Sequence, residues 1–160
     1  MNIEKAQELV SQLGVELGGD ANSYTMNEQG EVDMVFEDNL PVQIRFLEPT
    51  LIVSSIVASD LPADDPGLFA TLMDYQFMGI RTLGCVLAWN SEADNLVLSR
   101  MLHGDITSVR LAEELSLLLR CTREVQEDLV PLLEGDYRIA EETTEEQPPT
   151  DFIPTPFDRA

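Results

Sequence analysis

Apolar residues recur every three or four positions in the first stretch of the chain, which predicts an amphipathic helix. The apolar positions of this helix are Ile3, Ala6, Leu9, Val10 and Leu13. Asn2 can cap its N-terminus, because the side-chain oxygen accepts hydrogen bonds from free backbone amides. Gly14 is the predicted C-terminal stop. From about residue 23 the period of the pattern changes to two, so strands are expected next.

The stretches 32–37, 42–46 and 51–58 each fit a short β-strand. In the first two, apolar residues alternate with polar ones, and the third is rich in β-branched residues. The connections between them are short and contain Asn, Asp, Gly and Pro, which favour turns. We therefore expect three to four strands joined as an antiparallel meander.

A second helix is predicted from Pro66 to about Met78, with Asp65 as its cap and Gly79 near its end. Proline suits the first helical position, where an N–H would have no intrahelical partner. Apolar side chains go most of the way around this helix: Leu68, Phe69, Leu72, Met73, Tyr75, Phe77 and Met78. A surface helix needs only one apolar stripe. The helix is therefore either enclosed within the domain, or packs one face on its own sheet and the other on a second subunit.

Two further strands, 84–89 and 96–102, flank a polar turn, and a long helix is predicted over 107–133. The buried stripe of this helix is expected to comprise Leu111, Leu115, Leu118, Val125, Leu129 and Leu132. The element order is helix, three to four strands, helix, two strands, helix. Because strands do not alternate regularly with helices, this order predicts an α+β fold with a twisted antiparallel sheet.

Residues 134–160 differ in composition from the rest of the chain. This tail is acidic and contains prolines, which predicts disorder, and it ends in an apolar cluster that includes Phe152, Ile153 and Phe157. Such a cluster could instead dock on a partner or on the body of the protein itself. We therefore divide the chain into a folded domain, 1–133, and a tail, 134–160.

The charge of the chain excludes several classes of partner. Its 160 residues include 30 acidic and 9 basic side chains, a formal net charge of −21, of which −15 belongs to residues 1–133. A protein that neutralises phosphates needs a basic face, and an anionic membrane would repel this one, so neither nucleic acid nor a membrane surface is an expected partner. No apolar run is long enough to insert into a membrane. Cys85 and Cys121 are expected as buried thiols of a cytosolic protein.

Catalytic chemistry has little support in the sequence. His103 is the single histidine and falls in a predicted turn. No phosphate-binding loop, paired-cysteine motif or calcium-loop spacing occurs. The many carboxylates fall mostly in turns and on outer helix faces, where solvation explains them. We therefore expect no catalytic residues, no metal and no cofactor, and keep a carboxylate-dependent hydrolase only as a remote alternative.

Two segments carry a resemblance to a known family. Residues 9–57 combine a helix ending in Leu-Gly with strands that lead to Leu-Pro-Val-Gln-Ile, and residues 79–90 read Gly-Ile-Arg-Thr-Leu-Gly-Cys-Val-Leu-Ala-Trp-Asn before the strand Asn-Leu-Val-Leu-Ser-Arg-Met-Leu. This organisation, over roughly residues 1–133, resembles the type III secretion chaperones that serve one or a few effectors, the CesT-like (Tir-chaperone) family.

The resemblance implies a bacterial cytoplasmic homodimer with the order α–β–β–β–α–β–β–α. Such a protein binds the N-terminal region of a secreted effector protein in extended form, with a secretion ATPase as a possible further partner and without a cofactor. The dimer interface it implies consists of Leu68, Leu72, Met73, Phe77, Cys85, Leu87 and Trp89. The effector-binding grooves it implies include Leu9, Leu13, Val35, Leu47 and Ile52. The alternative is a regulatory adaptor of the same fold that sequesters a protein partner.

Overall fold

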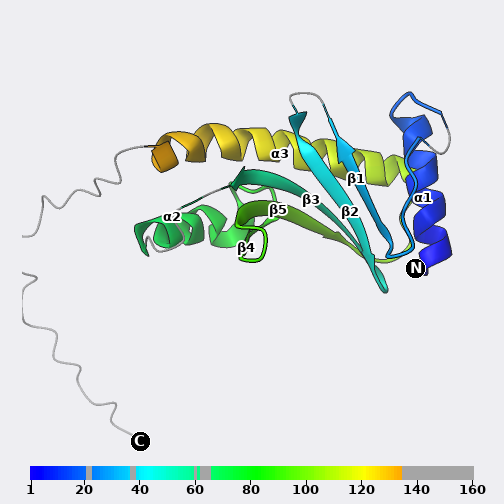
Figure 1. The fold of residues 1–160 in the computed structure, drawn as a ribbon, viewed down its shortest axis with the longest axis horizontal. Coiled ribbons are helices and arrows are strands. Elements are labelled where there is room, and N and C mark those ends of the chain that lie inside the picture. The colour runs from blue at the N-terminus through cyan, green and yellow to red at the C-terminus, as the bar shows by residue number, and fades with distance from the viewer. Residues whose placement is uncertain (21–22, 37–38, 60, 62–65, 135–160) are drawn as a thin grey trace, which may run out of the picture.

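The computed structural model of the chain describes residues 1–20, 23–36, 39–59, 61 and 66–134 (Figure 1). Its elements are α1 (Ile3–Glu16), β1 (Glu31–Val35), β2 (Pro41–Leu47), β3 (Thr50–Ser59), α2 (Pro66–Gln76), the short 3-10 helix η2 (Phe77–Gly79), β4 (Val86–Asn90), β5 (Asn95–Leu102) and α3 (Ser108–Glu134). The predicted α+β class and element order are confirmed, with three strands before α2. The predicted cap Asp65 and the tail from residue 135 onward lie outside the described residues.

The five strands form one antiparallel sheet in the order β1-β2-β3-β5-β4. Helix α3 packs across β3 and β5, and α1 packs against α3, so the two long helices lie on the same side of the sheet (Figure 1). The opposite side, which we call the open face, has no helix over it in the described part of the chain. No helix there is long and apolar enough to cross a membrane.

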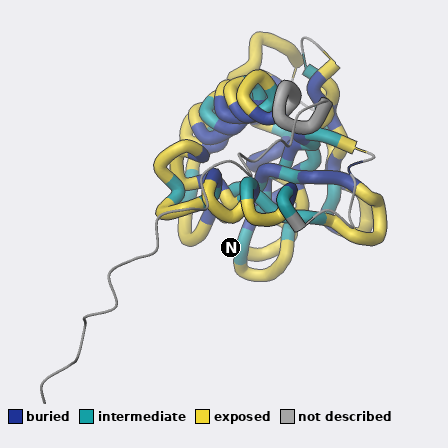
Figure 2. Tube along the Cα trace, turned by 90° about the vertical axis from the view of Figure 1, so that its left-hand side faces the viewer, coloured by how far each residue is buried: buried dark blue, intermediate teal, exposed yellow. Residues whose placement is uncertain are grey.

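The core lies between the sheet and these helices. On α3 the predicted stripe is confirmed as far as it is described: Leu111, Leu115, Leu118, Val125 and Leu129 are all fully buried, whereas the side chain of Leu132 lies outside the described residues. Strand β3 alternates strictly, with Leu51, Val53, Ser55 and Val57 on the core face. Figure 2 shows the buried stretches of the chain inside and the turns exposed. A continuous apolar layer of this kind provides most of the driving force for folding.

Helix α1 confirms one predicted terminus and corrects the other. The backbone N–H of Lys5 donates to Asn2 Oδ1 over 3.0 Å, so Asn2 is the cap. The predicted stop at Gly14 is wrong, because the helix continues to Glu16 and Gly18, at φ 82°, follows its end. Gly14 is required for packing instead: a Cβ at this position would lie 2.7 Å from the carbonyl oxygen of Asp20. Glycine here permits the chain after the helix to fold back onto it.

A buried carboxylate joins α3 to the sheet. Glu114 is only 4% exposed and forms ion pairs with Arg100 of β5 and Arg110, one turn earlier on α3. Arg100 Nη1 also donates to the carbonyl oxygen of Leu83 over 2.9 Å, which connects the segment before β4 to the same network. A buried charge is stable only while it is paired.

Replacing Glu114 with alanine should destabilise the fold by about 3 kcal/mol, because Arg100 loses its ionic partner in a largely buried site. Glu113→Ala is the matched control, since Glu113 is exposed and its ion pair with Arg110 lies at the surface; its effect should stay within about 0.5 kcal/mol. Urea unfolding monitored by circular dichroism measures both changes. Equal midpoints for the two variants would contradict the structural role of Glu114.

The two cysteines are free and buried, as expected. Burial raises the pKa of the Cys121 thiol to about 12, and the neighbouring Cys85 thiol adds to the shift. Burial, together with a 3.0 Å hydrogen bond that the hydroxyl donates to Asp128, raises the pKa of Tyr75 to about 12. All of these groups are neutral in the folded protein at pH 7.

The free energy of unfolding should therefore fall as the pH rises from about 9 towards 12. In that range the unfolded chain releases thiol and phenol protons that the folded protein retains, at up to ~1.4 kcal/mol per pH unit for each group. Urea titrations at a series of pH values measure the slope, which Cys121→Ala and Tyr75→Phe should each reduce. A slope that neither variant changes would show that these groups do not carry the effect.

Candidate functional site

Helix α2 and the segment after it expose a continuous run of apolar side chains. Leu68, Leu72 and Tyr75 of α2 are buried against the body of the domain. On the other side Met73 is 72% exposed and Phe77 67%. We call this surface the α2 face; it comprises Phe69, Met73, Phe77, Met78, Ile80 and Leu83. Among the described residues its one ring contact is that of Phe69 with Trp89, and the other side chains are exposed, so the interpretation of α2 as an enclosed helix is wrong.

The residues predicted at a dimer interface divide into three groups. Met73 and Phe77 lie on the α2 face. Leu87 and Trp89 are half-buried, because they pair with Leu98 and Leu96 and so share the core face of the sheet. Leu68, Leu72 and Cys85 are buried in the core of their own subunit. These last three are corrected: a side chain that packs inward is not available to a second subunit.

The segment 77–84 is held in a compact conformation that keeps its apolar side chains outward. Met78 and Leu83 have positive φ angles of 55° and 50°, as do the two glycines beside them. The backbone N–H of Gly84 donates to the Gly79 carbonyl over 2.9 Å. Ile80 and Leu83 were not among the predicted interface residues, because the helical pattern that identified α2 ends before them. Met78, at the end of that pattern, was not among them either.

One edge of the sheet is occupied by a side chain. Gln76, at the end of α2, accepts a 2.6 Å hydrogen bond from the backbone N–H of Leu87 and donates a 3.2 Å bond to the carbonyl oxygen of Cys85. These are the groups that a further strand beside β4 would use. The β4 edge is therefore closed where it begins.

The opposite edge, along β1, is open. The Gly30 carbonyl accepts a hydrogen bond from the N–H of Phe46, and the Phe36 N–H donates to the carbonyl of Leu40, so both residues face the β2 side of the hairpin. Because pairing alternates along an antiparallel strand, the odd-numbered residues of β1 point their N–H and C=O groups outward. Asn27 satisfies both outward groups of Glu31. For Asp33 and Val35 no such bond is found among the described residues. Two consecutive outward positions are thus free to pair with another strand.

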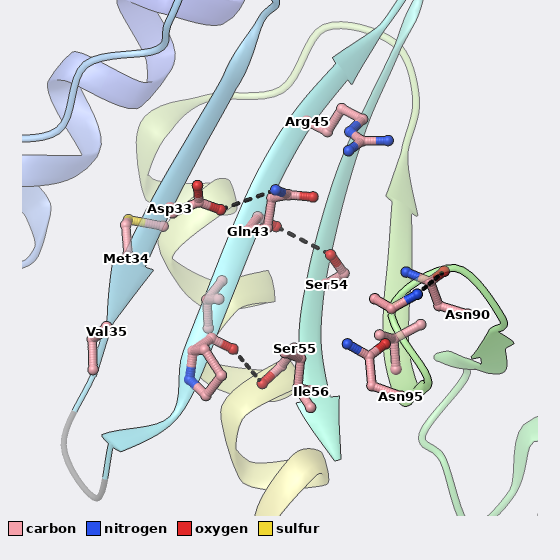
Figure 3. A pocket seen from close by; sticks show the side chains of 14 residues that line it. Asp33, Met34, Val35, Gln43, Arg45, Ser54, Ser55, Ile56, Asn90 and Asn95 are labelled. Atoms are coloured by element: carbon pink, nitrogen blue, oxygen red, sulfur yellow. Dashed lines mark hydrogen bonds between the residues drawn. The ribbon is translucent and has the colours of Figure 1, made fainter. Parts of the chain in front are cut away.

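Two hollows flank this open edge. The open-face hollow, about 410 Å³, extends from β1 across Gln43 and Ser54 to the β4–β5 turn (Figure 3). The helix-side hollow, about 490 Å³, lies between α1, β1 and α3 and is lined mainly by Leu17, Tyr24, Phe36 and Leu119, with Ser116 and Arg123. Val35 lines both hollows. The β1 edge therefore lies between two concave surfaces, one on each side of the sheet.

The residues predicted to line a binding groove are also divided. Val35 and Leu47 are well exposed, and Ile52 is half-buried on the open face. Leu9 and Leu13 are core residues, because the apolar stripe of α1 is the face that packs inward; this part of the prediction is corrected. Tyr24, Phe36 and Leu119 were missed, since a hollow built from three elements leaves no periodic signal in the sequence.

Polar side chains in these surfaces satisfy one another. Gln43 Nε2 donates to Asp33 Oδ1 over 2.9 Å, and Arg45 pairs with Glu31 at 2.8 Å, both on the open face. His103 Nδ1 lies 3.1 Å from Thr50 Oγ1 beyond the end of β5. Among the described residues no group of three or more His, Cys, Asp or Glu side chains could hold a metal ion. The β1 edge and its two hollows therefore offer a bound chain backbone hydrogen bonds and apolar contacts.

The solved structures most similar in shape include three secretion-related complexes. The HopA1–SchA chaperone–effector complex gives a TM-score of 0.61 at 13% identity, covering 78% of this chain and 94% of that one. The Yersinia pestis type III secretion chaperone SycH, in complex with a fragment of YscM2, gives 0.55 at 18% identity, covering 75% and 98%. The ExoU–SpcU complex from the type III secretion system of Pseudomonas aeruginosa gives 0.58 at 18% identity, covering 78% and 98%. At these identities the likeness shows the fold.

Sequence comparison gives the family. No curated protein matches this chain. The sequence model of the Tir chaperone protein (CesT) family matches residues 8–126. This range extends from the middle of α1 through most of α3 and includes the α2 face and the β1 edge. The chain belongs to the Tir chaperone protein (CesT) family.

Proposed function

We propose that this protein is a bacterial cytoplasmic chaperone that binds the N-terminal region of one or a few type III secretion effectors and keeps it extended for secretion. It acts by binding and not by catalysis. Membership of the CesT family supports this function, as does the presence of an effector in the HopA1–SchA complex. The observation that carries the proposal is the open β1 edge between two hollows. We call the bound effector segment the client.

The open edge explains how a client can be held extended. A client strand beside β1 pairs with the outward N–H and C=O groups of Asp33 and Val35. It does so through its own backbone groups, which every client sequence has, so this pairing gives affinity without a sequence requirement. Side chains of an extended strand alternate between two sides. One set therefore enters the open-face hollow and the other the helix-side hollow, which gives selectivity for alternating apolar residues.

The acidity of the domain supports the same function. Residues 1–133 carry a net charge of −15, and a large charge of one sign keeps a protein soluble while apolar surface is exposed. The field also favours association with basic client segments and accelerates their approach. The secretion ATPase that the family resemblance implies is proposed as a further partner.

We also propose that two copies associate through the α2 face. An exposed apolar surface of this kind marks an interaction site in soluble proteins. Self-association through a two-fold axis would place α2 of one copy against α2 of the other, so that each methionine and phenylalanine side chain meets an apolar partner. The β1 edge lies at the other end of the sheet, so a dimer formed this way leaves the client surface accessible.

Replacing Val35 with proline should weaken client binding roughly tenfold, because proline removes an outward N–H, a loss of about 1–2 kcal/mol. Proline is tolerated at such an edge position. Val35→Ala is the matched control, since it keeps the N–H and loses only side-chain contact. The probe is the N-terminal region of the exported protein encoded in the neighbouring reading frame, measured by isothermal titration calorimetry.

Equal affinities for the proline and alanine variants would contradict strand addition at β1. If the protein instead retains a non-exported regulator from its native cytoplasm and does not bind the exported probe, the adaptor function replaces the chaperone function.

Phe77→Glu and Met73→Glu should each convert the dimer to a monomer, because a buried carboxylate without a partner is strongly unfavourable at an apolar interface. Val109→Glu is the matched control, as Val109 is similarly exposed but lies on α3, away from the α2 face. Light scattering at micromolar concentration gives the mass of each variant. A monomeric parent protein would refute the dimer.

A further inference from the structure

The helix-side hollow is suited to an aromatic side chain. Its lining combines apolar and polar surface: the apolar and aromatic members are Tyr24, Phe36 and Leu119, which are half-buried, and Leu17, which is exposed at one end. Its volume of about 490 Å³ is within the usual range for a ligand pocket, roughly 300–1,000 Å³. Arg123 and Ser116 are its polar members on α3.

The flank of α3 that leads to this hollow carries charge in a definite order. From the C-terminal end of the helix backward, the exposed charged residues on this flank are first acidic, at Glu127 and Glu124. The next charged residues are the cations Arg123 and Arg120. The ion pair of Arg120 with Glu124 is long, at 3.9 Å. Leu119, which directly precedes Arg120 and lies one turn before Arg123, lines the hollow.

The chain beyond α3 carries the complementary order. After Asp136 comes the cation Arg138, followed by four glutamates at positions 141, 142, 145 and 146. The apolar cluster Phe152-Ile153-Pro154-Thr155-Pro156-Phe157 comes last. A tail that turns back antiparallel to α3 would therefore place its cation against the acidic end of the helix, its glutamates against Arg120 and Arg123, and its phenylalanines at the hollow.

The tail is long enough to make this return. From Glu134 back to Leu119 the helix rises about 22 Å, at about 1.5 Å per residue. The seventeen residues from 135 to 151 span up to about 56 Å when extended, at about 3.3 Å per residue. The connection can therefore reverse direction and still reach the hollow. The four prolines at 148, 149, 154 and 156 favour an extended chain, which lowers the entropy lost on docking.

We propose that residues 138–157 fold back along α3 of the same chain and place Phe152 and Phe157 in the helix-side hollow. This proposal rests on the proposed function for its consequence: the tail occupies part of the client surface and must leave when a client binds. The tethered segment acts at a high effective concentration, so even weak docking excludes weakly binding chains. A secreted effector with a strong binding segment displaces it.

The direct test uses the full-length protein labelled with 4-fluorophenylalanine and observed by ¹⁹F NMR. The signals of Phe152 and Phe157 are assigned with F152L and F157L, and a synthetic peptide of residues 148–160 gives the free reference. Docking predicts signals that are shifted from the peptide values and as broad as those of the folded domain. Sharp signals at the peptide values would overturn the proposal.

Two substitutions locate the docking site. Leu119→Glu places a charge in the hollow and should return both tail signals to the peptide values, and Leu17→Glu at its other end should do the same. Val109→Glu, on α3 outside the hollow, is the control and should change nothing. Shifted signals that survive both hollow variants would refute the assigned site. Shifts that depend on protein concentration would mean that a second copy supplies the tail, which refutes docking within one chain.

The charge order and the link to the client are tested separately. Replacing all four glutamates at 141–146 with glutamine should increase the free fraction of the tail, and unchanged signals would refute the role of Arg120 and Arg123. Because these spectra are recorded without a client, failure of the chaperone function leaves them valid. Adding the exported N-terminal probe should release the tail signals; a probe that binds while the tail stays docked would refute competition.

Discussion

The structure depends on one constraint: a five-stranded sheet has two faces, and the helices that the structure describes cover only one of them. Helix α3 lies across the central strands and α1 packs against it, which concentrates the apolar side chains of both helices and of β3 in a single layer. The other functional features are surfaces that this layer does not cover. The open face, the free edge of β1 and the outer side of α2 are the surfaces that no element in the described part of the chain covers.

Much of this arrangement could be predicted from local patterns. The period-two alternation located the strands, and the stripe on α3 was identified residue by residue, because both patterns are set by one neighbouring layer. Helix α2 was recognised as apolar on two sides. Which residues belong to the buried side and which to the exposed side could not be predicted, since Leu72 and Met73 are both apolar. Only the position of the core shows that Leu72 is buried and Met73 exposed.

The errors have a common physical origin. Leu9 and Leu13 were assigned to a groove, whereas α1 has one apolar stripe and needs all of it for the core. Gly14 was taken as a helix stop, although its role is to admit the carbonyl of Asp20. The helix-side hollow combines Tyr24, Phe36 and Leu119 from separate elements. Properties that depend on contacts between distant segments are not encoded in the spacing of apolar residues.

The closure of the β4 edge by Gln76 has a consequence for assembly. A sheet with two free edges can extend indefinitely, because the last strand of one molecule pairs with the first strand of the next. Here the β1 edge of one copy meets a β4 edge whose first backbone groups already bind a glutamine side chain. Pairing of the β1 edge of one copy with the β4 edge of the next is therefore blocked, which prevents head-to-tail growth into a fibre. The protein can keep its β1 edge open for binding without polymerising through its sheet.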